Sequence, residues 1–382
     1  LLCLRQWLLS IHDILEETGL GDNKMKKKLV GMLATATLLT MALAGNVQAA
    51  EIRSVGPDGE AAVDASTIEL TDDQIAQIKE GGYTAAICLH YGGNDWSTSQ
   101  QKGLEDTFGE LGIEIVAVTD ANFSAETQVS NIETVMAKKP DILVSIPTDA
   151  TATADAYKQA AAAGIKIVFM DQRADGLEAG KDYVSVVSAD NYGNGYASGT
   201  VLGDALGGKG KVAMVYYDAN FAPTNQRDEG FRDAMKNYPD IEIVTEQGFT
   251  DESGCAEQGD AILTQFPNID GIYASWDVPM EGVLSAVRAA GMEGKVTLAC
   301  NDLGNNVARE IASGNIAGGG AQMPYDQGVA EAKLAALALL GEETPSYVAV
   351  PAETVTHENV LEAYTDVYHV ETPDWLKEAY VE

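Results

Sequence analysis

Short apolar runs alternate with amphipathic segments along most of this chain. Residues 85–89 form one such run, and the absence of polar alternation is typical of a strand buried on both faces. A polar loop follows at 92–97, and then Leu104, Phe108 and Leu111 recur on one helical face. The pattern therefore predicts a strand, a loop and a helix in that order.

The same order recurs through the chain. The expected strands after the first are 113–118, which we read as a second buried strand, then 142–146, 165–170, 183–187, 212–217, 241–244, 271–274, 296–300, 316–321 and 347–350. The expected helices are 71–79, 125–136, an Ala-rich segment ending at 163, 194–206, 227–238, 255–266, 280–291, 305–313 and 327–340. Strands that alternate with helices favour parallel sheets in right-handed βαβ units. Two runs of such units predict an α/β protein with two doubly wound parallel-sheet domains.

Polar and aromatic side chains follow several of the expected strands. In open α/β sheets this carboxyl end is where ligands bind. The candidate ligand-binding residues are Asn94, Trp96, Asp171, Gln172, Arg227, Trp276, Asp302 and Gln322. Carboxylates, amides and a guanidinium can read the hydroxyl groups of a polyhydroxylated ligand, and we expect Trp96 and Trp276 to sandwich its ring. For each residue alone the plainer interpretation is a helix cap or a core aromatic.

Enzyme signatures are missing from the sequence. Neither G-x-S-x-G nor H-E-x-x-H occurs, and Gly203-x4-Gly208-Lys209 lacks the Ser or Thr that a phosphate-binding loop requires. Asp171, Asp277 and Asp302 could converge, so paired-carboxylate glycoside hydrolysis stays open at this stage. We expect no catalytic residues, no metal site and no cofactor.

The N-terminal region has the pattern of a targeting signal. Met25 is followed by three lysines, by an apolar run at 29–44, and by small residues at 47 and 49. This predicts a cleaved signal peptide at 25–49 and a periplasmic protein that is not lipid-anchored, since no cysteine follows the apolar run. Segment 1–24 fits no part of such a signal, and we interpret it as an over-extension upstream of the true start.

The formal charge of the 382-residue chain is −34. Removing 1–49 takes away five Lys/Arg and four Asp/Glu, which leaves −35. Such acidity makes nucleic acid and anionic membrane surfaces poor partners. Cys88, Cys255 and Cys300 remain, and their spacing predicts neither a disulfide framework nor a zinc site.

From about 83 to 350 the chain resembles the periplasmic sugar-binding proteins of ABC importers, in the ribose-binding-like branch with the type I fold. The motifs that carry the resemblance are the Asn94-x-Trp96 loop with Gly103, and the segments 146–149, 168–171, 188–191, 208–212, 227–231 and 321–328. The resemblance places Asn94, Trp96, Asp171, Arg227, Asp302 and Gln322 at the ligand. Three positions depart from the ribose-binding pattern: Ile146 replaces an Asn, Gln172 replaces an Arg that stands one place on as Arg173, and Trp276 stands where Asn is common.

The resemblance also implies an organisation and partners. The polar lead-in is 50–82, the N-terminal lobe 83–190 plus 323–351, and the C-terminal lobe 191–322 plus 352–382. We expect three hinge crossings near 190–191, 322 and 351. The implied partners are a monosaccharide or polyol and a membrane ABC permease, with a chemoreceptor left open and a monomer expected. The alternatives are a receptor for an autoinducer-2-like signalling furanose or a nucleoside, and a secreted glycoside-acting enzyme. A related transcriptional repressor is disfavoured by the acidity and the expected signal peptide.

Overall fold

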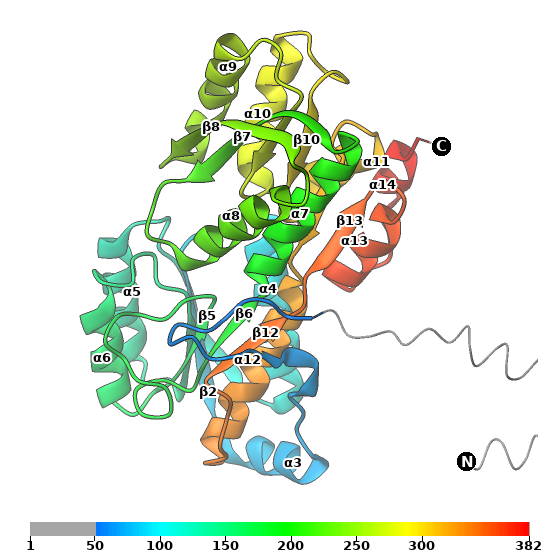
Figure 1. Cartoon of the computed structure of the whole chain (residues 1–382). Coiled ribbons are helices and arrows are strands. Elements are labelled where there is room, and N and C mark those ends of the chain that lie inside the picture. Colours follow the sequence, from blue (N-terminus) through cyan, green and yellow to red (C-terminus); the bar gives the residue numbers. More distant parts are fainter. Residues whose placement is uncertain (1–50, 382) are drawn as a thin grey trace, which may run out of the picture. The chain divides into compact units, whose positions relative to one another are not determined.

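The computed structural model describes residues 51–381. The expected signal peptide at 25–49 and the upstream segment 1–24 lie outside the described residues. Within the described part, the chain builds two sheets, and helices pack against both faces of each (Figure 1). No helix in this part is long and apolar enough to cross a membrane.

The first sheet has seven parallel strands in the order β1-β12-β6-β5-β4-β2-β3. The strands are β1 (Val63–Asp64), β2 (Thr84–Leu89), β3 (Glu114–Asp120), β4 (Ile142–Ser145), β5 (Lys166–Met170), β6 (Ser185–Ala189) and β12 (Tyr347–Val350). The associated helices are η1 (Ala65–Thr67), α3 (Asp72–Gly81), α4 (Asp95–Leu111), α5 (Ala125–Ala137), α6 (Ala154–Ala162) and α12 (Pro324–Leu339).

The second sheet has six strands in the order β13-β11-β10-β9-β7-β8, and only its edge strand β13 is antiparallel. The strands are β7 (Lys209–Tyr217), β8 (Asp240–Phe249), β9 (Gly271–Ala274), β10 (Thr297–Cys300), β11 (Gly318–Ala321) and β13 (Glu353–Thr356). The associated helices are α7 (Asn191–Ala205), α8 (Ala222–Met235), η2 (Glu252–Gly254), α9 (Cys255–Gln265), α10 (Asp277–Ala289), α11 (Asn305–Ala312), α13 (Val360–Tyr368) and α14 (Asp374–Ala379). The parallel α/β architecture predicted from the sequence is confirmed.

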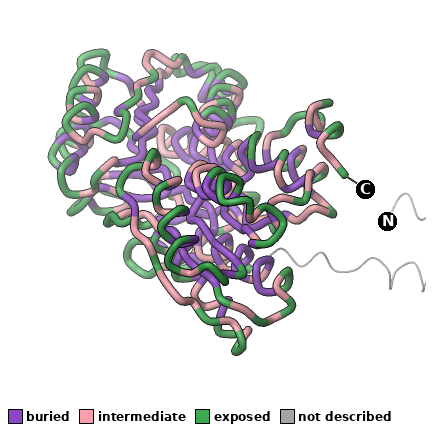
Figure 2. The backbone as a smooth tube through the Cα atoms, turned by 90° about the horizontal axis from the view of Figure 1, so that it is seen from above, coloured by how far each residue is buried: buried purple, intermediate pink, exposed green. Residues whose placement is uncertain are grey.

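The apolar run of β2 is explained by its place inside the first sheet. Ala85 and Ile87 pack into the cluster under α4 and α12, whereas Ala86 and Cys88 pack into the cluster under α5 and α6. Successive side chains of a strand point to opposite faces, so a strand covered on both sides has no polar alternation. Figure 2 shows buried stretches inside the molecule and exposed stretches on outer helices and loops.

The sequence predicts a second buried strand at 113–118. The strand is present, but the prediction that it is buried is wrong. β3 is the edge strand of the first sheet, and most of its side chains are half-buried or exposed. Val118 is 43% exposed. An apolar run signals a strand but does not give its position in the strand order, so an edge strand can be taken for a central one.

The chain passes from one sheet to the other at three places. These are the turn from β6 into α7, the turn from β11 into α12, and the short link from β12 to β13. They coincide with the three crossings expected near 190–191, 322 and 351. The C-terminal elements β13, α13 and α14 were not predicted, and they complete the second sheet and cover one of its faces.

Candidate ligand-binding site

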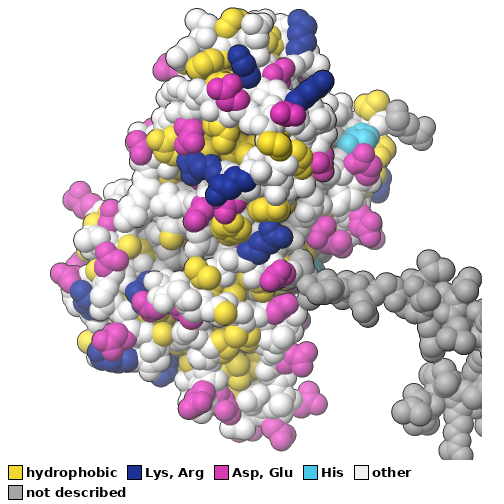
Figure 3. Space-filling view, in the orientation of Figure 1, with side chains coloured by type: hydrophobic (Ala, Val, Ile, Leu, Met, Phe, Trp, Pro, Cys, Tyr) yellow, Lys and Arg dark blue, Asp and Glu magenta, His cyan; other side chains and the backbone are white. Residues whose placement is uncertain are grey.

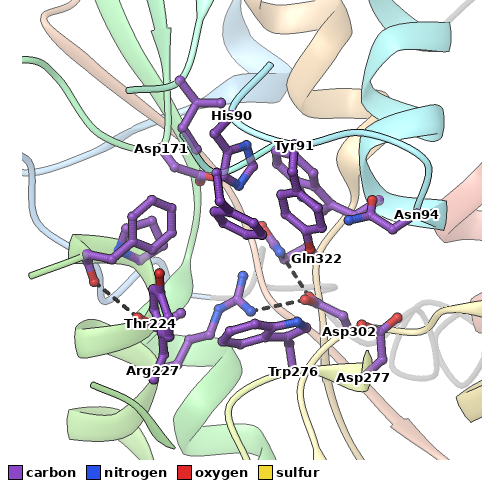
Figure 4. Close-up of a pocket in the computed structure, with 16 residues that line it drawn as sticks. His90, Tyr91, Asn94, Asp171, Thr224, Arg227, Trp276, Asp277, Asp302 and Gln322 are labelled. Atoms are coloured by element: carbon purple, nitrogen blue, oxygen red, sulfur yellow. Dashed lines mark hydrogen bonds and ion pairs between the residues drawn. The ribbon is translucent and has the colours of Figure 1, made fainter. Parts of the chain in front are cut away.

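One pocket brings together the carboxyl ends of strands from both sheets. Its lining residues are His90, Tyr91, Asn94, Trp96, Phe123, Ile146, Asp171, Tyr217, Phe221, Pro223, Thr224, Arg227, Trp276, Asp277, Asp302 and Gln322. Seven of the eight predicted ligand-binding residues are among them. Figure 4 shows the labelled polar side chains converging on a shared space from several elements.

Gln172 is the predicted residue that does not line this pocket. Its Nε2 donates to the carbonyl oxygen of Pro147 at 2.8 Å, and its Oε1 accepts from the backbone N–H of Ala222 at 3.2 Å. The side chain therefore links the loop after β4 to the start of α8. Arg173 also lies elsewhere, since its guanidinium binds both carboxylate oxygens of Asp58 at 2.7 and 2.8 Å.

Two pocket carboxylates follow strands in a backbone conformation that is uncommon for residues other than glycine. Asp171 comes directly after β5 with φ 53°, and Asp302 comes two residues after β10 with φ 68°. Such left-handed conformations cost energy in a residue with a Cβ, and they cluster at functional sites. The turn that each forms directs its carboxylate towards the pocket.

Arg227 is the centre of a hydrogen-bonded charge network. From the second turn of α8, its Nη1 donates to Asp302 Oδ2 at 3.0 Å and to the Ser275 carbonyl at 3.2 Å, while its Nε donates to Asn191 Oδ1 at 2.8 Å. Gln322 Nε2 donates to the other oxygen of Asp302 at 2.9 Å. Arg227 is 5% exposed. The network joins α7, α8, the end of β10 and the link after β11.

Asp171 has a separate set of partners in the first sheet. Its Oδ1 accepts from Ser188 Oγ at 2.9 Å, from Gln327 Nε2 at 3.3 Å and from the Ala189 N–H at 3.4 Å. Burial raises the pKa of Asp171, and the charge of Arg227 opposes that shift. Among the described residues, the hydrogen bonds from Ser188, Ala189 and Gln327 all reach Oδ1.

Asn94 combines the two roles weighed for it from the sequence. It is the N-cap of α4, where its Oδ1 accepts the Ser97 N–H at 2.7 Å, and it also lines the pocket. Capping uses the amide oxygen. The Nδ2 donor is therefore left for another partner.

An aromatic wall was largely missed by the sequence interpretation. His90, Tyr91 and Phe123 line the pocket beside Trp96, and Tyr91 stacks on Phe123 with ring centroids 4.1 Å apart. His90 meets Trp96 edge-on at 5.7 Å. Burial lowers the pKa of His90 to about 3, so its imidazole is neutral at pH 7. The signal was the dipeptide His90-Tyr91 directly after β2, at the same strand end as Asn94.

Trp276 is both a pocket residue and a core residue. It packs against Tyr217 and Phe249 with ring centroids at 5.6 and 5.1 Å, and its Nε1 donates to Glu252 at 2.8 Å. It is 6% exposed. The core interpretation and the ligand-wall interpretation of this tryptophan are therefore compatible.

Three lining side chains have a buried polar atom without a hydrogen-bond partner among residues 51–381. These are His90 Nδ1, Trp96 Nε1 and Gln322 Oε1. Buried polar atoms are nearly always hydrogen-bonded in native proteins, and an unpaired one costs roughly 1–3 kcal/mol. Unpaired donors and acceptors around one pocket indicate that a small polar ligand completes it.

The described part of the chain offers neither a metal site nor a reactive thiol. Among residues 51–381 there is no group of three or more His, Cys, Asp or Glu arranged to hold a metal ion. Cys88, Cys255 and Cys300 are buried free thiols, and burial raises the pKa of Cys88 to about 11. The lining residues of the pocket include no cysteine, and its carboxylates and histidine are not arranged as such a group in 51–381.

Comparison with known proteins identifies the family. Residues 85–343 match the family model described as a periplasmic binding protein domain. The D-ribose/D-allose-binding protein of Pseudomonas aeruginosa is 29% identical over 273 residues, which cover 69% of this chain and 83% of that protein. The ribose import binding protein of Salmonella typhimurium is 24% identical over 272 residues, covering 71% and 90%.

Solved structures agree with this match. One neighbour is an ABC transporter periplasmic solute binding protein from Actinobacillus succinogenes with bound D-allose. It superposes with a TM-score of 0.68 at 29% identity, and the match covers 73% of this chain and 99% of that chain. A solute binding protein from Agrobacterium vitis bound with α-D-tagatopyranose gives 0.70 at 25% identity, covering 76% and 100%. Because the family model spans more than half of the chain, this protein belongs to the periplasmic binding protein domain family and has its type I fold.

Proposed function

We propose that this protein is a periplasmic receptor that captures a monosaccharide or polyol in the pocket and delivers it to a membrane ABC permease. The observation that carries the proposal is the set of unpaired polar atoms beside aromatic rings in one pocket. Hydroxyl groups both donate and accept, and the C–H faces of a sugar lie well against indole and phenol rings. The relatives named for ribose and allose, and the neighbour with bound D-allose, support the same ligand class.

The ligand contacts are assigned to Asn94, Trp96, Asp171, Arg227, Trp276, Asp302 and Gln322, with the two tryptophans on opposite sides of the ring. The Gln172 side chain joins the loop after β4 to the start of α8 and is assigned no contact with the ligand. The lobes are 83–190 plus 323–351 and 191–322 plus 352–382, and the three crossings serve as hinges. Ligand favours the closed form because only there do both lobes contact it.

Delivery to a permease requires that the ligand is released unchanged, so the proposal includes the absence of catalysis. It also includes cleavage of the signal peptide at 49, location in the periplasm without a lipid anchor, and a monomeric receptor. A signalling furanose or a nucleoside is the alternative cargo for the same pocket.

A thermal-shift screen of residues 50–382 against pentoses, hexoses, deoxysugars, polyols and nucleosides tests this function. A ligand at 100 times its dissociation constant adds about 2.7 kcal/mol to the free energy of unfolding, which raises the melting temperature by several degrees. We expect a sugar or polyol to produce that shift and to be recovered chemically unchanged. A shift with nucleosides alone favours the alternative cargo, and consumption of the hit contradicts a transport receptor.

A further inference from the structure

The pocket contains more carboxylates than cations. Asp171, Asp277 and Asp302 line it, and Arg227 is the single guanidinium among its lining residues, which include no lysine. The next residue after Asp171 is Gln172, a neutral amide whose side chain is bound outside the pocket. His90 is neutral, so it offers no compensating charge.

Arg227 is already committed to Asp302. The 3.0 Å ion pair between them is buried, with 5% and 11% of the two side chains exposed. Among residues 51–381, no Lys, Arg or His nitrogen lies within ion-pair distance of the Asp277 carboxylate. Among the same residues, the hydrogen bond that the Asp277 side chain accepts comes from the Val278 N–H, which donates to Oδ1 at 2.8 Å.

The surroundings of Asp277 contain further negative charge. Figure 4 shows its side chain beside that of Asp302, and Glu281 and Asp95 also act on it electrostatically. A Cβ placed on Gly304 would lie 2.1 Å from Asp277 Oδ2, so this carboxylate oxygen lies close to the Gly304 backbone. Burial, and then the charge of Asp302, raise the pKa of Asp277 above its usual range. A half-buried carboxylate beside other carboxylates is stabilised by a cation or by a proton.

A second observation points to a ligand that donates hydrogen bonds. Gln322 is 4% exposed, its Nε2 is bound to Asp302, and its Oε1 is a buried acceptor without a partner. This acceptor lines the same pocket as Asp277. An ammonium group donates three hydrogen bonds, accepts none, and supplies the missing positive charge.

We propose that the ligand is a small polyhydroxylated molecule that carries a protonated amino group, an amino sugar or an amino polyol, with Asp277 as the counter-charge of its ammonium. This inference rests on the proposed function and specifies its ligand class. The hydroxyl groups occupy the Asn94, Asp171 and Arg227 side of the pocket. The net negative charge of the whole chain favours the approach of such a cation.

Matched ligand pairs test the inference in the wild-type protein. Isothermal titration calorimetry at pH 7 compares 2-amino-2-deoxyhexoses with their parent hexoses, and 1-amino-1-deoxypolyols with their parent polyols. We expect at least one amine to bind ten or more times tighter than its neutral parent. A neutral member that binds as tightly as its amine, or tighter, overturns the inference and leaves the proposed function standing. If no member of either series binds, the inference and the sugar or polyol function both fail.

The Asp277→Asn variant tests the assigned residue. It keeps the side-chain volume and removes the charge, so we expect the preference for the amine to fall at least tenfold. Asp260→Asn is the matched control, because it removes an exposed carboxylate of α9 away from the pocket. If the Asp277→Asn variant keeps the full amine preference, Asp277 is not the counter-charge. The wild-type comparison decides the ligand class even if that variant fails to fold.

Discussion

The two walls of the pocket are built from different kinds of side chain. The wall contributed by the first sheet carries an aromatic cluster of His90, Tyr91, Phe123 and Trp96 beside Asn94 and Asp171, whereas the wall contributed by the second sheet is organised around the Arg227 charge network, with Trp276 and Tyr217 beside it. Apolar contact changes gradually with the area removed. A buried charge network fails abruptly when one member is lost, because its remaining members are left unpaired.

We expect the two kinds of side chain to have different roles: the aromatic rings accommodate the sugar ring, and the polar groups select the positions of its hydroxyl groups. Aromatic faces accept many sugar rings, since every ring has a C–H face. Fixed donors and acceptors reject a ligand whose hydroxyl groups are placed differently, because a buried polar atom is then left without a partner. We therefore expect the second-sheet wall to determine most of the ligand preference. On the face shown in Figure 3, the acidic side chains are scattered and do not gather in one patch.

The largest effect is expected from Arg227→Met. This variant leaves Asp302 buried with one hydrogen bond from Gln322 and removes the nearby charge that opposes the pKa shift of Asp171. Removing one partner of a buried ion pair costs about 3–5 kcal/mol of folding stability. Because the variant also leaves Asp302 without its counter-charge at the pocket, we expect affinity for the hit of the screen to fall about 100-fold or more. Calorimetric titration measures the loss.

Arg232→Met is the matched control for that variant. Arg232 lies in the same helix and pairs with Glu246 at 2.6 Å, but both side chains are more than one third exposed. Such surface pairs contribute about 0–1 kcal/mol. If Arg227→Met and Arg232→Met bind the ligand equally well, the charge network is not part of the site.

The next effect is a pH dependence of stability that comes from Asp228, a buried carboxyl in the same helix as Arg227. Asp228 accepts from Ser275 Oγ at 2.7 Å and from Tyr273 OH at 3.3 Å, and burial raises its pKa from 3.8 to about 7. The folded protein therefore holds a proton that the unfolded chain releases near pH 4. The stability that this proton provides is present below pH 4 and is lost as pH rises through 7.

Asp228→Asn mimics the protonated form and should remove this pH dependence. Relative to wild type, the variant should gain stability between pH 4 and 8, by at most about 4 kcal/mol, since each pKa unit corresponds to about 1.4 kcal/mol. Urea unfolding at pH 5 and pH 8 gives the comparison. A variant that is less stable than wild type at pH 8 contradicts a protonated Asp228.

The polar pocket residues were easier to predict than the aromatic ones. Asp171, Asp302 and Gln322 follow strands in a topology that places strand ends together, so position along the chain was enough. His90 and Phe123 look like core residues in a sequence. Phe123 reaches the pocket from a loop where it and Asn122 both have positive φ, of 59° and 47°. No hydrophobic pattern encodes that turn.

The misplacement of Gln172 has a related cause. Asp171 has a φ of 53°, so the chain turns there instead of continuing as a strand, and the Gln172 side chain is held by Pro147 and Ala222 away from the pocket. The alternation of strands and helices was predictable because it follows from hydrophobic periods. The edge position of β3 and the pairing of β13 with β11 were not, since they depend on contacts between distant segments.

A smaller effect is expected on the aromatic wall. Trp96→Ala removes one face of the expected sandwich and should weaken binding about tenfold, or about 1.4 kcal/mol. The matched change on the other wall is Trp276→Phe, which keeps an aromatic ring but removes the 2.8 Å bond to Glu252. We expect it to weaken binding less than Trp96→Ala does. If both variants bind like wild type, the tryptophan sandwich is wrong.

The smallest effect is expected from Arg173→Met. In the ribose-binding pattern an arginine follows the aspartate of the fourth strand, and Arg173 stands one place beyond that position. Its guanidinium pairs with Asp58 outside the pocket, with 23% and 63% of the two side chains exposed. An ion pair so open to solvent contributes about 0–1 kcal/mol to folding. Ligand affinity should change less than twofold in a calorimetric titration, with Asp58→Asn as the control that breaks the same pair from the other side. A tenfold loss in Arg173→Met that Asp58→Asn does not reproduce would mean that the arginine swings into the site when ligand is bound. The pocket would then gain a second cation, and the need for a positively charged ligand would disappear.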